Sequence, residues 1–313
     1  MNTYIKSILL CLIFVCLVYI FCFVKQQLAM IANVLENDFE CGKPKCDLNF
    51  NKNLPVSLPA VTDDLSLTSE TIAFHKSLIN FMASVVYYSL EGKDYVPLTN
   101  MTTLKQVNTQ SDKLMSIVTK INDVNNILIV GTRGTQNLSD LMEDTHLAQV
   151  EFPVQNLHLY FNDGNKPMCH QGFFNVFNQV KDQVLQILNQ ELKNINQVVL
   201  VGHSLGAAVS CLLGITIKML YPSLQVNVVT YACPRIGNKD ICDLIDSNLQ
   251  HIRFRNDSDA VPTFPSAVSA NEEDPTQPWF YYHSGEQVVF NANWKSVLNN
   301  HLIPVYQSFV NSL

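Results

Sequence analysis

An apolar strand, a tight turn and an apolar helix follow one another without interruption near the middle of this chain. Val198–Val201 is apolar throughout, Gly202–Gly206 forms a Gly-His-Ser-Leu-Gly turn, and Leu205–Leu220 is again largely apolar. A turn this tight leaves room only for glycine two residues before and after its central residue, Ser204. It also exposes the serine at the carboxyl end of a strand, above a helix N-terminus that favours negative charge. We therefore predict that Ser204 is a nucleophile and that its neighbour His203 is structural.

The segments around this turn alternate between strand and helix patterns. Strands are predicted at Ile127–Val130, Val198–Val201, Gln225–Thr230 and His251–Arg255, and helices at Thr71–Leu90, Phe173–Leu192 and Leu205–Leu220. Strands that are apolar throughout, rather than at every second residue, are typical of parallel sheets covered on both faces. The pattern predicts an α/β domain over residues 69–313, with a mostly parallel central sheet and helices on both faces.

The N-terminus carries an unbroken apolar run, Ile8–Val24, between Lys6 and Lys25. A helix of this length spans roughly 25 Å, close to the thickness of a bilayer's hydrocarbon core. We predict residues 1–25 as a retained signal anchor rather than a cleaved signal peptide, because the bulky stretch Phe21–Lys25 replaces a small-residue cleavage site. Residues 26–68, which are polar and weakly periodic, are predicted to be a juxtamembrane linker.

Composition narrows the class of partner. Apolar residues make up 47% of the chain and charged residues 15%, which indicates a filled core. The net charge of −7 comes without a basic block, so we expect no nucleic-acid partner.

The compartment is less clearly indicated. The flanking lysines slightly favour a cytosolic C-terminus, whereas a leader-like N-terminus and sequons at Asn100, Asn137 and Asn256 are compatible with export. We expect a lumenal or extracellular domain on a membrane anchor, with secretion after cleavage as the alternative.

The nine cysteines do not decide the redox compartment. Cys41 and Cys46 flank a short loop that a disulfide would close. Because no second pair follows at zinc-ligand spacing, we expect no metal site there. Cys211 falls on a predicted core helix, where a small apolar packing role is expected.

A nucleophilic serine needs a base, and the base needs a carboxylate to orient it; in this fold they follow in the order serine, acid, histidine. Asp257 and Asp259 both lie just beyond the predicted strand His251–Arg255, at the edge where the serine projects. His283 and His301 are the candidate bases. Chemistry alone favours His301 only slightly.

Six motifs in order are similar to those of the fungal-type triacylglycerol lipases, the class 3 lipase family. They are Val130–Thr135, His170–Phe173, Val199–Ala207, Pro234–Asn238, Asp259–Pro262 and His283–Glu286. The resemblance runs from about Ile127 to Tyr306 and implies an α/β-hydrolase fold with Ser204, Asp259 and His301 as the triad. The segment at His283 resembles a family segment that is not catalytic.

The same resemblance implies an oxyanion hole at the backbone N–H of Leu205 and at Thr135. It also implies a lid after Thr135, where an apolar stripe recurs at helical spacing: Leu138, Leu141 and Met142. An ordinary surface helix packed on the domain is the alternative for that stripe.

The chain departs from the family pattern at three places. The family often has Asp or Glu just before the catalytic histidine, where this chain has Asn300. Pro304 interrupts the segment that follows, and Ala232–Cys233 replaces the usual glycine-containing pair before Pro234. None of these changes removes a catalytic atom.

Together the residues and the resemblance predict a serine carboxylic ester hydrolase that acts on lipid esters through an acyl-enzyme on Ser204, without metal or organic cofactor. The expected partners are a lipid or ester substrate and a membrane contacted by the N-terminal helix. A phospholipase A1, a small-ester or thioester hydrolase, and a non-enzymatic lipid-binding protein with a lipase fold are the alternatives. The intact set Ser204, Asp259 and His301 argues against the last.

Overall fold

The computed structural model describes a large part of the chain in eight ranges. They are residues 69–83, 101–109, 114–121, 127–134, 147–154, 166–272, 274–294 and 296–313. The chain divides into two compact units, Met1–Asn49 and Phe50–Leu313, and every described residue belongs to the second. The predicted anchor and linker, residues 1–68, lie outside the described ranges. Within those ranges no helix has both the length and the apolar composition needed to cross a bilayer.

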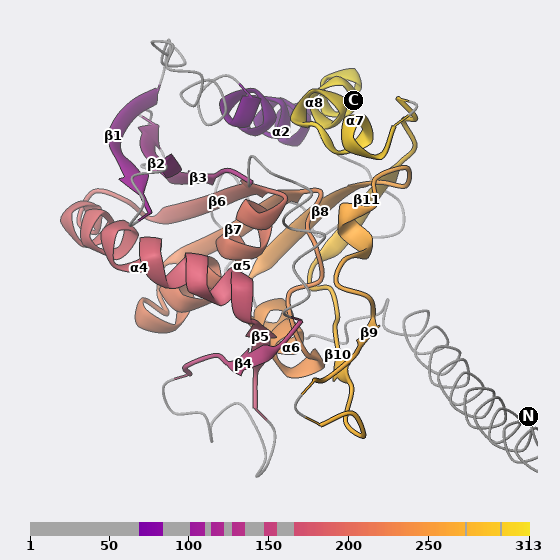
Figure 1. Ribbon diagram of the computed structural model, residues 1–313. Coiled ribbons are helices and arrows are strands. Elements are labelled where there is room, and N and C mark those ends of the chain that lie inside the picture. The colour runs from indigo at the N-terminus through magenta and orange to yellow at the C-terminus, as the bar shows by residue number, and fades with distance from the viewer. Residues whose placement is uncertain are drawn as a thin grey trace, which may run out of the picture. The chain divides into compact units, whose positions relative to one another are not determined.

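A seven-stranded sheet lies at the centre of the described residues, in the order β1-β2-β3-β6-β7-β8-β11 (Figure 1). The strands are β1 (Met101–Asn108), β2 (Leu114–Ile121), β3 (Ile127–Thr132), β6 (Gln197–His203), β7 (Gln225–Tyr231), β8 (Gln250–Asn256) and β11 (Glu286–Phe290). The five from β3 to β11 pair in parallel, and only β1 and β2 are antiparallel. The prediction of a mostly parallel sheet is confirmed.

Helices cover both faces of this sheet, as predicted (Figure 1). One face carries α4 (Gln171–Glu191), α5 (Leu205–Leu220) and α6 (Lys239–Asn248), and the other carries α2 (Ser69–Phe81) and α8 (Ile303–Ser312). Successive side chains of a strand point to opposite faces, so one strand serves two cores. In β6, Leu200 packs with the helices α4 to α6, whereas Val199 packs in the cluster that includes α2 and α8.

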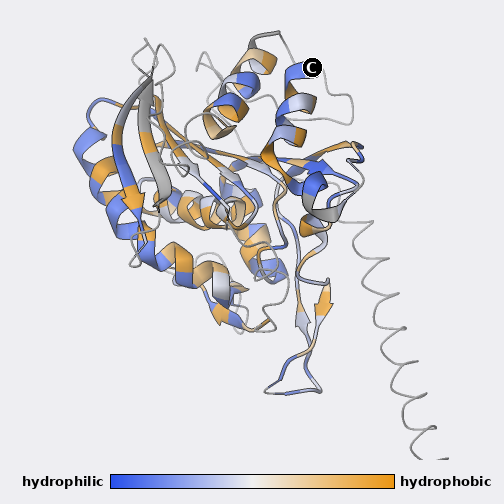
Figure 2. Cartoon of the chain, turned by 45° about the horizontal axis from the view of Figure 1, so that its top comes forward, coloured by the Kyte–Doolittle hydropathy of each residue, from blue (hydrophilic) through white to orange (hydrophobic). Residues whose placement is uncertain are grey.

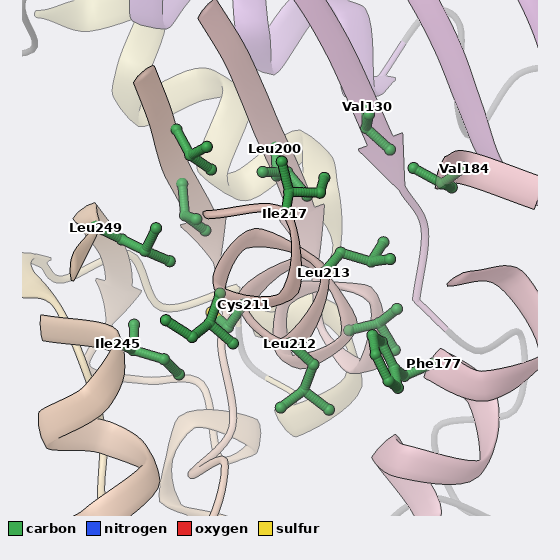
Figure 3. Packing of buried hydrophobic residues seen from close by; sticks show 14 of the residues in the cluster. Val130, Phe177, Val184, Leu200, Cys211, Leu212, Leu213, Ile217, Ile245 and Leu249 are labelled. Carbon is green, nitrogen blue, oxygen red and sulfur yellow. The ribbon is translucent and has the colours of Figure 1, made fainter. Parts of the chain in front are cut away.

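The helices follow their sequence patterns. In α4 the buried residues recur every three or four positions, and polar residues fill the outer side (Figure 2). Helix α5 is buried along most of its length because β6, β7 and neighbouring helices surround it. Figure 3 shows its Leu212, Leu213 and Ile217 packed beside Leu200 of the sheet and Phe177 of α4. Each such side chain contributes roughly 1.5–3 kcal/mol by leaving water.

Short elements complete the described residues around the carboxyl edge of the sheet. They are the pair β4 (Gln149–Glu151) and β5 (Met168–His170), the pair β9 (Val268–Ser269) and β10 (Trp279–Phe280), the turn η4 (Val261–Thr263) and the helix α7 (Val297–His301). Loops at this edge of a parallel sheet are where functional side chains gather.

Candidate active site

The turn between β6 and α5 has the backbone that its sequence predicts. Ser204 has φ 59° and ψ −132°, a conformation that costs a residue with a side chain on the order of 1–3 kcal/mol. A Cβ atom on Gly202 would overlap the Gly206 carbonyl, and one on Gly206 would overlap the carbonyl oxygens of Thr132 and Arg133. Both glycines are therefore required by close backbone approach, and the turn holds Ser204 at the end of the sheet.

Ser204 is buried, and its Oγ has no hydrogen-bond partner among the described residues. Its backbone N–H donates to the Tyr231 carbonyl at 3.0 Å, which fixes the turn against β7. Leu205 opens α5, so its N–H has no acceptor within the helix and is available to an anion beside Ser204. The other predicted oxyanion residue, Thr135, lies outside the described ranges, as do Leu138, Leu141 and Met142 of the predicted lid.

Asp259 and His301 lie together, although 42 residues separate them in the chain. The His301 Nδ1 is 2.9 Å from Asp259 Oδ2, and both side chains are almost completely buried. Asp259 lies in the loop that follows β8, and His301 is the last residue of α7. A buried carboxylate bonded to Nδ1 fixes the ring orientation and leaves Nε2 for proton transfer.

The alternative acid and base have different surroundings. Asp257 is half-exposed and pairs with Arg255, its carboxylate 3.6 Å from the guanidinium. The Nε2 of His283 donates to the Pro262 carbonyl at 2.8 Å. Burial, and then the positive charges of Arg253 and Arg235, hold the pKa of His283 well below its ordinary value. His283 is thus a neutral residue tied to the loop after Asp259, and the described contacts give it no carboxylate.

His203 links the serine turn to His301. Its Nε2 donates to the His301 carbonyl at 2.8 Å, and the two rings lie 4.6 Å apart between centroids. Burial, followed by the proximity of His301, lowers the pKa of His203 well below its usual value. The contacts fit the structural role predicted for His203: its neutral ring connects the turn at Ser204 to the candidate base His301.

Tyr306 of α8 is a member of the site that the sequence did not indicate. Its hydroxyl donates to Asp259 Oδ2 at 2.7 Å, the same oxygen that His301 contacts. Burial and the neighbouring carboxylate raise the pKa of Tyr306 well above its ordinary value, so the hydroxyl keeps its proton. The only signal in the sequence was an apolar periodicity after His301, which does not distinguish a buried Tyr from a buried Phe.

Asn256, noted above as a sequon, is not accessible in the folded domain. It is completely buried, and its Nδ2 donates to the carbonyls of Ala292 and Asn300 at 2.9 and 3.1 Å. A glycan attached to this nitrogen would leave it one N–H for the two carbonyls and would have to fit into a completely buried site. Asn256 is therefore a structural residue of the site in the folded domain, while Asn100 and Asn137 lie outside the described ranges.

Across the described ranges, no group of three or more His, Cys, Asp or Glu side chains is arranged to hold a metal ion. The described cysteines are free and buried: Cys169, Cys211, Cys233 and Cys242. Burial raises the pKa of the Cys211 thiol well above its ordinary value, in keeping with the packing role predicted for it. Cys41 and Cys46 lie outside the described residues.

A family model described as lipase (class 3) matches residues 129–269, which include the turn at Ser204 and the candidate acid Asp259. Over this segment the chain is similar to the class 3 lipase family. His301 lies beyond the matched segment, so the base rests on the contacts described above.

Curated relatives are similar to this chain over part of their length. A secreted mono- and diacylglycerol lipase, LIP1, of Malassezia globosa is 28% identical over 160 residues, covering 49% of this chain and 52% of its own. The chloroplastic phospholipase A(1) DAD1 of Arabidopsis thaliana is 24% identical over 157 residues, covering 47% of this chain and 35% of its own. The chain thus spans about half of the first relative and about a third of the second.

Solved structures agree on the fold. The lipase from Rhizopus microsporus var. chinensis aligns with a TM-score of 0.57 at 20% identity, over 80% of this chain and 86% of its own. A Rhizomucor miehei lipase propeptide complex aligns with a TM-score of 0.56 at 20% identity, over 73% and 71%. With the mostly parallel sheet and the turn at Ser204, this likeness identifies the fold as that of the α/β-hydrolases.

Proposed function

We propose that this chain is a serine carboxylic ester hydrolase that acts on lipid esters. The observation that carries the proposal is the buried contact of 2.9 Å between His301 Nδ1 and Asp259 Oδ2, beside a strained turn that presents Ser204. A binding protein has no need of an oriented imidazole beside a free serine hydroxyl, so the arrangement favours an enzyme.

The reaction we propose has two acyl-transfer steps. His301 Nε2 takes the proton of Ser204 Oγ as that oxygen bonds to the ester carbonyl carbon, and Asp259 stabilises the imidazolium. The tetrahedral intermediate collapses, the bond to the alcohol oxygen breaks, and His301 returns the proton to the leaving alcohol. Water then loses a proton to His301 and attacks the acyl-enzyme, which releases the carboxylic acid and restores Ser204.

The developing oxyanion needs two aligned donors. We assign the backbone N–H of Leu205 to this role because it starts α5 directly after Ser204. Thr135 remains our second proposed donor; it follows Arg133 and Gly134, and the carbonyl of Arg133 contacts Gly206 at the turn. Loss of one such donor typically costs on the order of 3 kcal/mol of transition-state stabilisation.

For the substrate, we propose acylglycerols or phospholipids rather than small soluble esters. The apolar stripe of Leu138, Leu141 and Met142, if it forms the lid, gives a surface that meets lipid. Relatives named mono- and diacylglycerol lipases and phospholipase A(1) support ester hydrolysis on lipids of both kinds. A small-ester hydrolase is the alternative that a comparison of substrates distinguishes.

We also propose that the catalytic domain lies outside the cytosol, either on a membrane anchor at residues 1–25 or secreted. The apolar run Ile8–Val24 supports entry into the export pathway, and several relatives are named as secreted. Alkaline carbonate extraction of cells expressing the full chain with a C-terminal tag separates the alternatives. An anchored chain stays in the membrane pellet, a secreted one appears in the medium, and a chain in the cytosolic fraction contradicts both.

Active-site labelling tests the enzymatic proposal. We expect a fluorophosphonate probe to label the wild type and His283→Gln, but neither Ser204→Ala nor His301→Ala. The glutamine introduced by His283→Gln retains an N–H that can reach the Pro262 carbonyl, which makes this variant a matched control for His301→Ala. Label that persists in Ser204→Ala contradicts the nucleophile, and label lost only with His283 contradicts the base.

Turnover then identifies the substrate class. Wild type and Ser204→Ala are compared on dispersed diacylglycerol, on phosphatidylcholine vesicles and on p-nitrophenyl butyrate. We expect serine-dependent release of fatty acid from at least one of the two lipids. Hydrolysis confined to the butyrate ester contradicts the lipid assignment, and no serine-dependent hydrolysis of any ester favours the binding-protein alternative.

A further inference from the structure

The candidate acid and base approach each other on two separate loops. Asp259 lies in the loop that follows β8, and His301 ends α7 after the loop that follows β11. A hydrogen bond of 2.9 Å between their side chains is too weak alone to hold two loops in register. Two buried amide side chains, Asn256 and Asn300, make further connections between these loops.

Asn256 uses all of its amide hydrogen-bonding capacity between these loops. Its Nδ2 donates to the carbonyls of Ala292 and Asn300 at 2.9 and 3.1 Å. Its Oδ1 accepts from the backbone N–H groups of Ala292 at 2.9 Å and of Ser258 at 3.3 Å. The side chain thus exchanges two hydrogen bonds with the backbone of Ala292, as a neighbouring strand residue would. It also contacts the carbonyl of Asn300, the residue before His301.

Asn300 makes the reciprocal connection. Its Nδ2 donates to the carbonyl of Ser258, the residue before Asp259, at 2.9 Å. Its Oδ1 accepts from the backbone N–H of Trp294 at 2.6 Å. Each amide therefore joins the acid loop to the base loop immediately beside the catalytic pair, and Asn300 is itself almost completely buried.

The two contacts of the Asn300 side chain suit an amide. The side chain must donate to one carbonyl and accept from one N–H, and an ionised carboxylate has no proton to donate. Aspartate here would set a charged oxygen against the Ser258 carbonyl in a buried site, where an unpaired charge is strongly unfavourable. The resembling lipases often carry an acid at this position, whereas in this chain the Asn300 amide both donates to the Ser258 carbonyl and accepts from the Trp294 N–H.

We propose that Asn256 and Asn300 form a positioning clamp that sets Asp259 and His301 at catalytic distance. Neither residue touches the reacting atoms; both act through the backbone that carries the pair. The proposal rests on the proposed ester hydrolysis, because it gives these amides an effect on rate as well as on stability. A displacement of about 1 Å in a catalytic group lowers the rate by up to roughly a hundredfold.

The test compares Asn300→Asp with Asn271→Asp, a matched change at a buried amide outside the triad loops. Asn271 donates to the Gln277 carbonyl at 2.9 Å and accepts from the Asp274 N–H at 3.2 Å, so it has the same bonding pattern. Folded fraction is measured by thermal unfolding, and kcat and KM on p-nitrophenyl butyrate. Per folded molecule, we expect kcat to fall at least roughly tenfold in Asn300→Asp with KM unchanged, and to stay within about twofold in Asn271→Asp.

A second measurement tests the positioning clamp by NMR, without measuring catalysis. The Nδ1 proton held between His301 and Asp259 gives a low-field proton NMR resonance, assigned by its loss in His301→Gln. We expect this resonance in the wild type and in Asn271→Asp, and its loss or broadening in Asn300→Asp. Asn300→Ala, which adds no charge, replaces Asn300→Asp in both measurements if Asn300→Asp does not fold. The same decrease in kcat and the same loss of the resonance are expected.

The outcomes separate the two proposals. Wild-type kcat and an intact resonance in folded Asn300→Asp or Asn300→Ala overturn the clamp and leave the ester hydrolase standing. A wild type without Ser204-dependent hydrolysis overturns the proposed function, while the resonance still tests the clamp.

Discussion

At the scale of single residues, the site is organised around the carboxylate of Asp259. Three groups donate to it: the ring of His301, the hydroxyl of Tyr306 and the backbone N–H of Val261, the last at 2.9 Å. An ionised carboxylate can only accept hydrogen bonds, and each of these three hydrogen bonds restricts its rotation. The acid is thereby fixed before any substrate arrives, which is the condition for orienting the imidazole of His301 without reorganisation.

Tyr306→Phe tests that arrangement because it removes one donor and keeps the ring. We expect kcat to fall roughly two- to tenfold. The free energy of unfolding should drop by about 1–3 kcal/mol, because the hydroxyl donates to Asp259 and also accepts from the Asn256 N–H at 3.3 Å, and each hydrogen bond has a usual net value of about 0.5–1.5 kcal/mol. Ester hydrolysis and urea unfolding measure the two effects. Tyr221→Phe is the control, because its hydroxyl donates to Asn189 at 2.6 Å on the exposed side of the domain. Equal kcat in the two variants would contradict a role for Tyr306 in the site.

The sequence predicted those site residues whose roles are indicated by the residues next to them in the chain. Ser204 was proposed as the nucleophile from the glycines two positions away, and Asp259 was a candidate acid from its place just after a strand. His301 was separated from His283 only by resemblance, because nothing local records which histidine faces a carboxylate. Tyr306 and Asn256 were not predictable, since their roles come from partners 47 and 44 residues away.

At the scale of elements, the turn from β6 into α5 depends on backbones that nearly touch. Because Gly206 faces the carbonyls of Thr132 and Arg133, the end of β3 lies directly against the first turn of α5. Any side chain at position 206 would separate the two, and Ser204 would move with α5.

Gly206→Ala is therefore expected to destabilise the domain by at least about 2 kcal/mol and to reduce labelling of Ser204 in the fraction that still folds. Thermal unfolding and fluorophosphonate labelling provide the measurements. Gly214→Ala in the same helix is the control: its added methyl meets side-chain atoms of Val228 at 2.9 Å and Leu249 at 3.1 Å, which can shift. There we expect a change within about 1 kcal/mol. Comparable losses in both variants would show that crowding of α5, not the approach to β3, is responsible.

Elements with a strong period were predictable, and edge elements were not. The predicted helix Phe173–Leu192 corresponds to α4, and the apolar runs at Ile127, Val198 and Gln225 correspond to β3, β6 and β7. β1 and β2 were missed because an antiparallel edge pair carries polar residues such as those of Thr102–Gln106, without an unbroken apolar run. β11 was missed for a related reason, since its side chains alternate between partly or fully exposed and buried.

At the scale of the whole molecule, both cores bury neutral histidines. Desolvation lowers the pKa of His75, on α2, from 6.5 to about 4, and that of His251, on β8, to about 3. His203 and His283 shift in the same direction. Since the unfolded chain binds protons at these sites near pH 6.5 and the folded one does not, stability is complete above that pH and declines as the pH falls toward 4. Burial raises the pKa of Asp246 to about 6. Because its folded state then binds a proton more readily than its unfolded state, this one group gains stability as the pH falls and partly offsets the histidines.

His75→Phe should flatten that decline. The ring of His75 is buried edge-on to Phe254, with centroids 5.4 Å apart, and neither nitrogen has a hydrogen-bond partner among the described residues. An apolar ring of similar shape removes the proton linkage without removing the packing. We expect the loss of unfolding free energy between pH 7 and pH 5 to be smaller by about 1–2 kcal/mol than in the wild type. Urea unfolding at the two pH values measures it, and an unchanged difference would assign the acid sensitivity to the other histidines.

The burial of Asn256 also bears on how the chain matures. In an exported chain, the nitrogen that would receive an N-linked sugar is the same Nδ2 that donates to Ala292 and Asn300. Because these contacts bury the nitrogen, we expect sugar transfer to it only before the segment after β11 folds against the end of β8. A chain glycosylated at Asn256 is then expected to lack these contacts between the loop of Asp259 and the loop of His301.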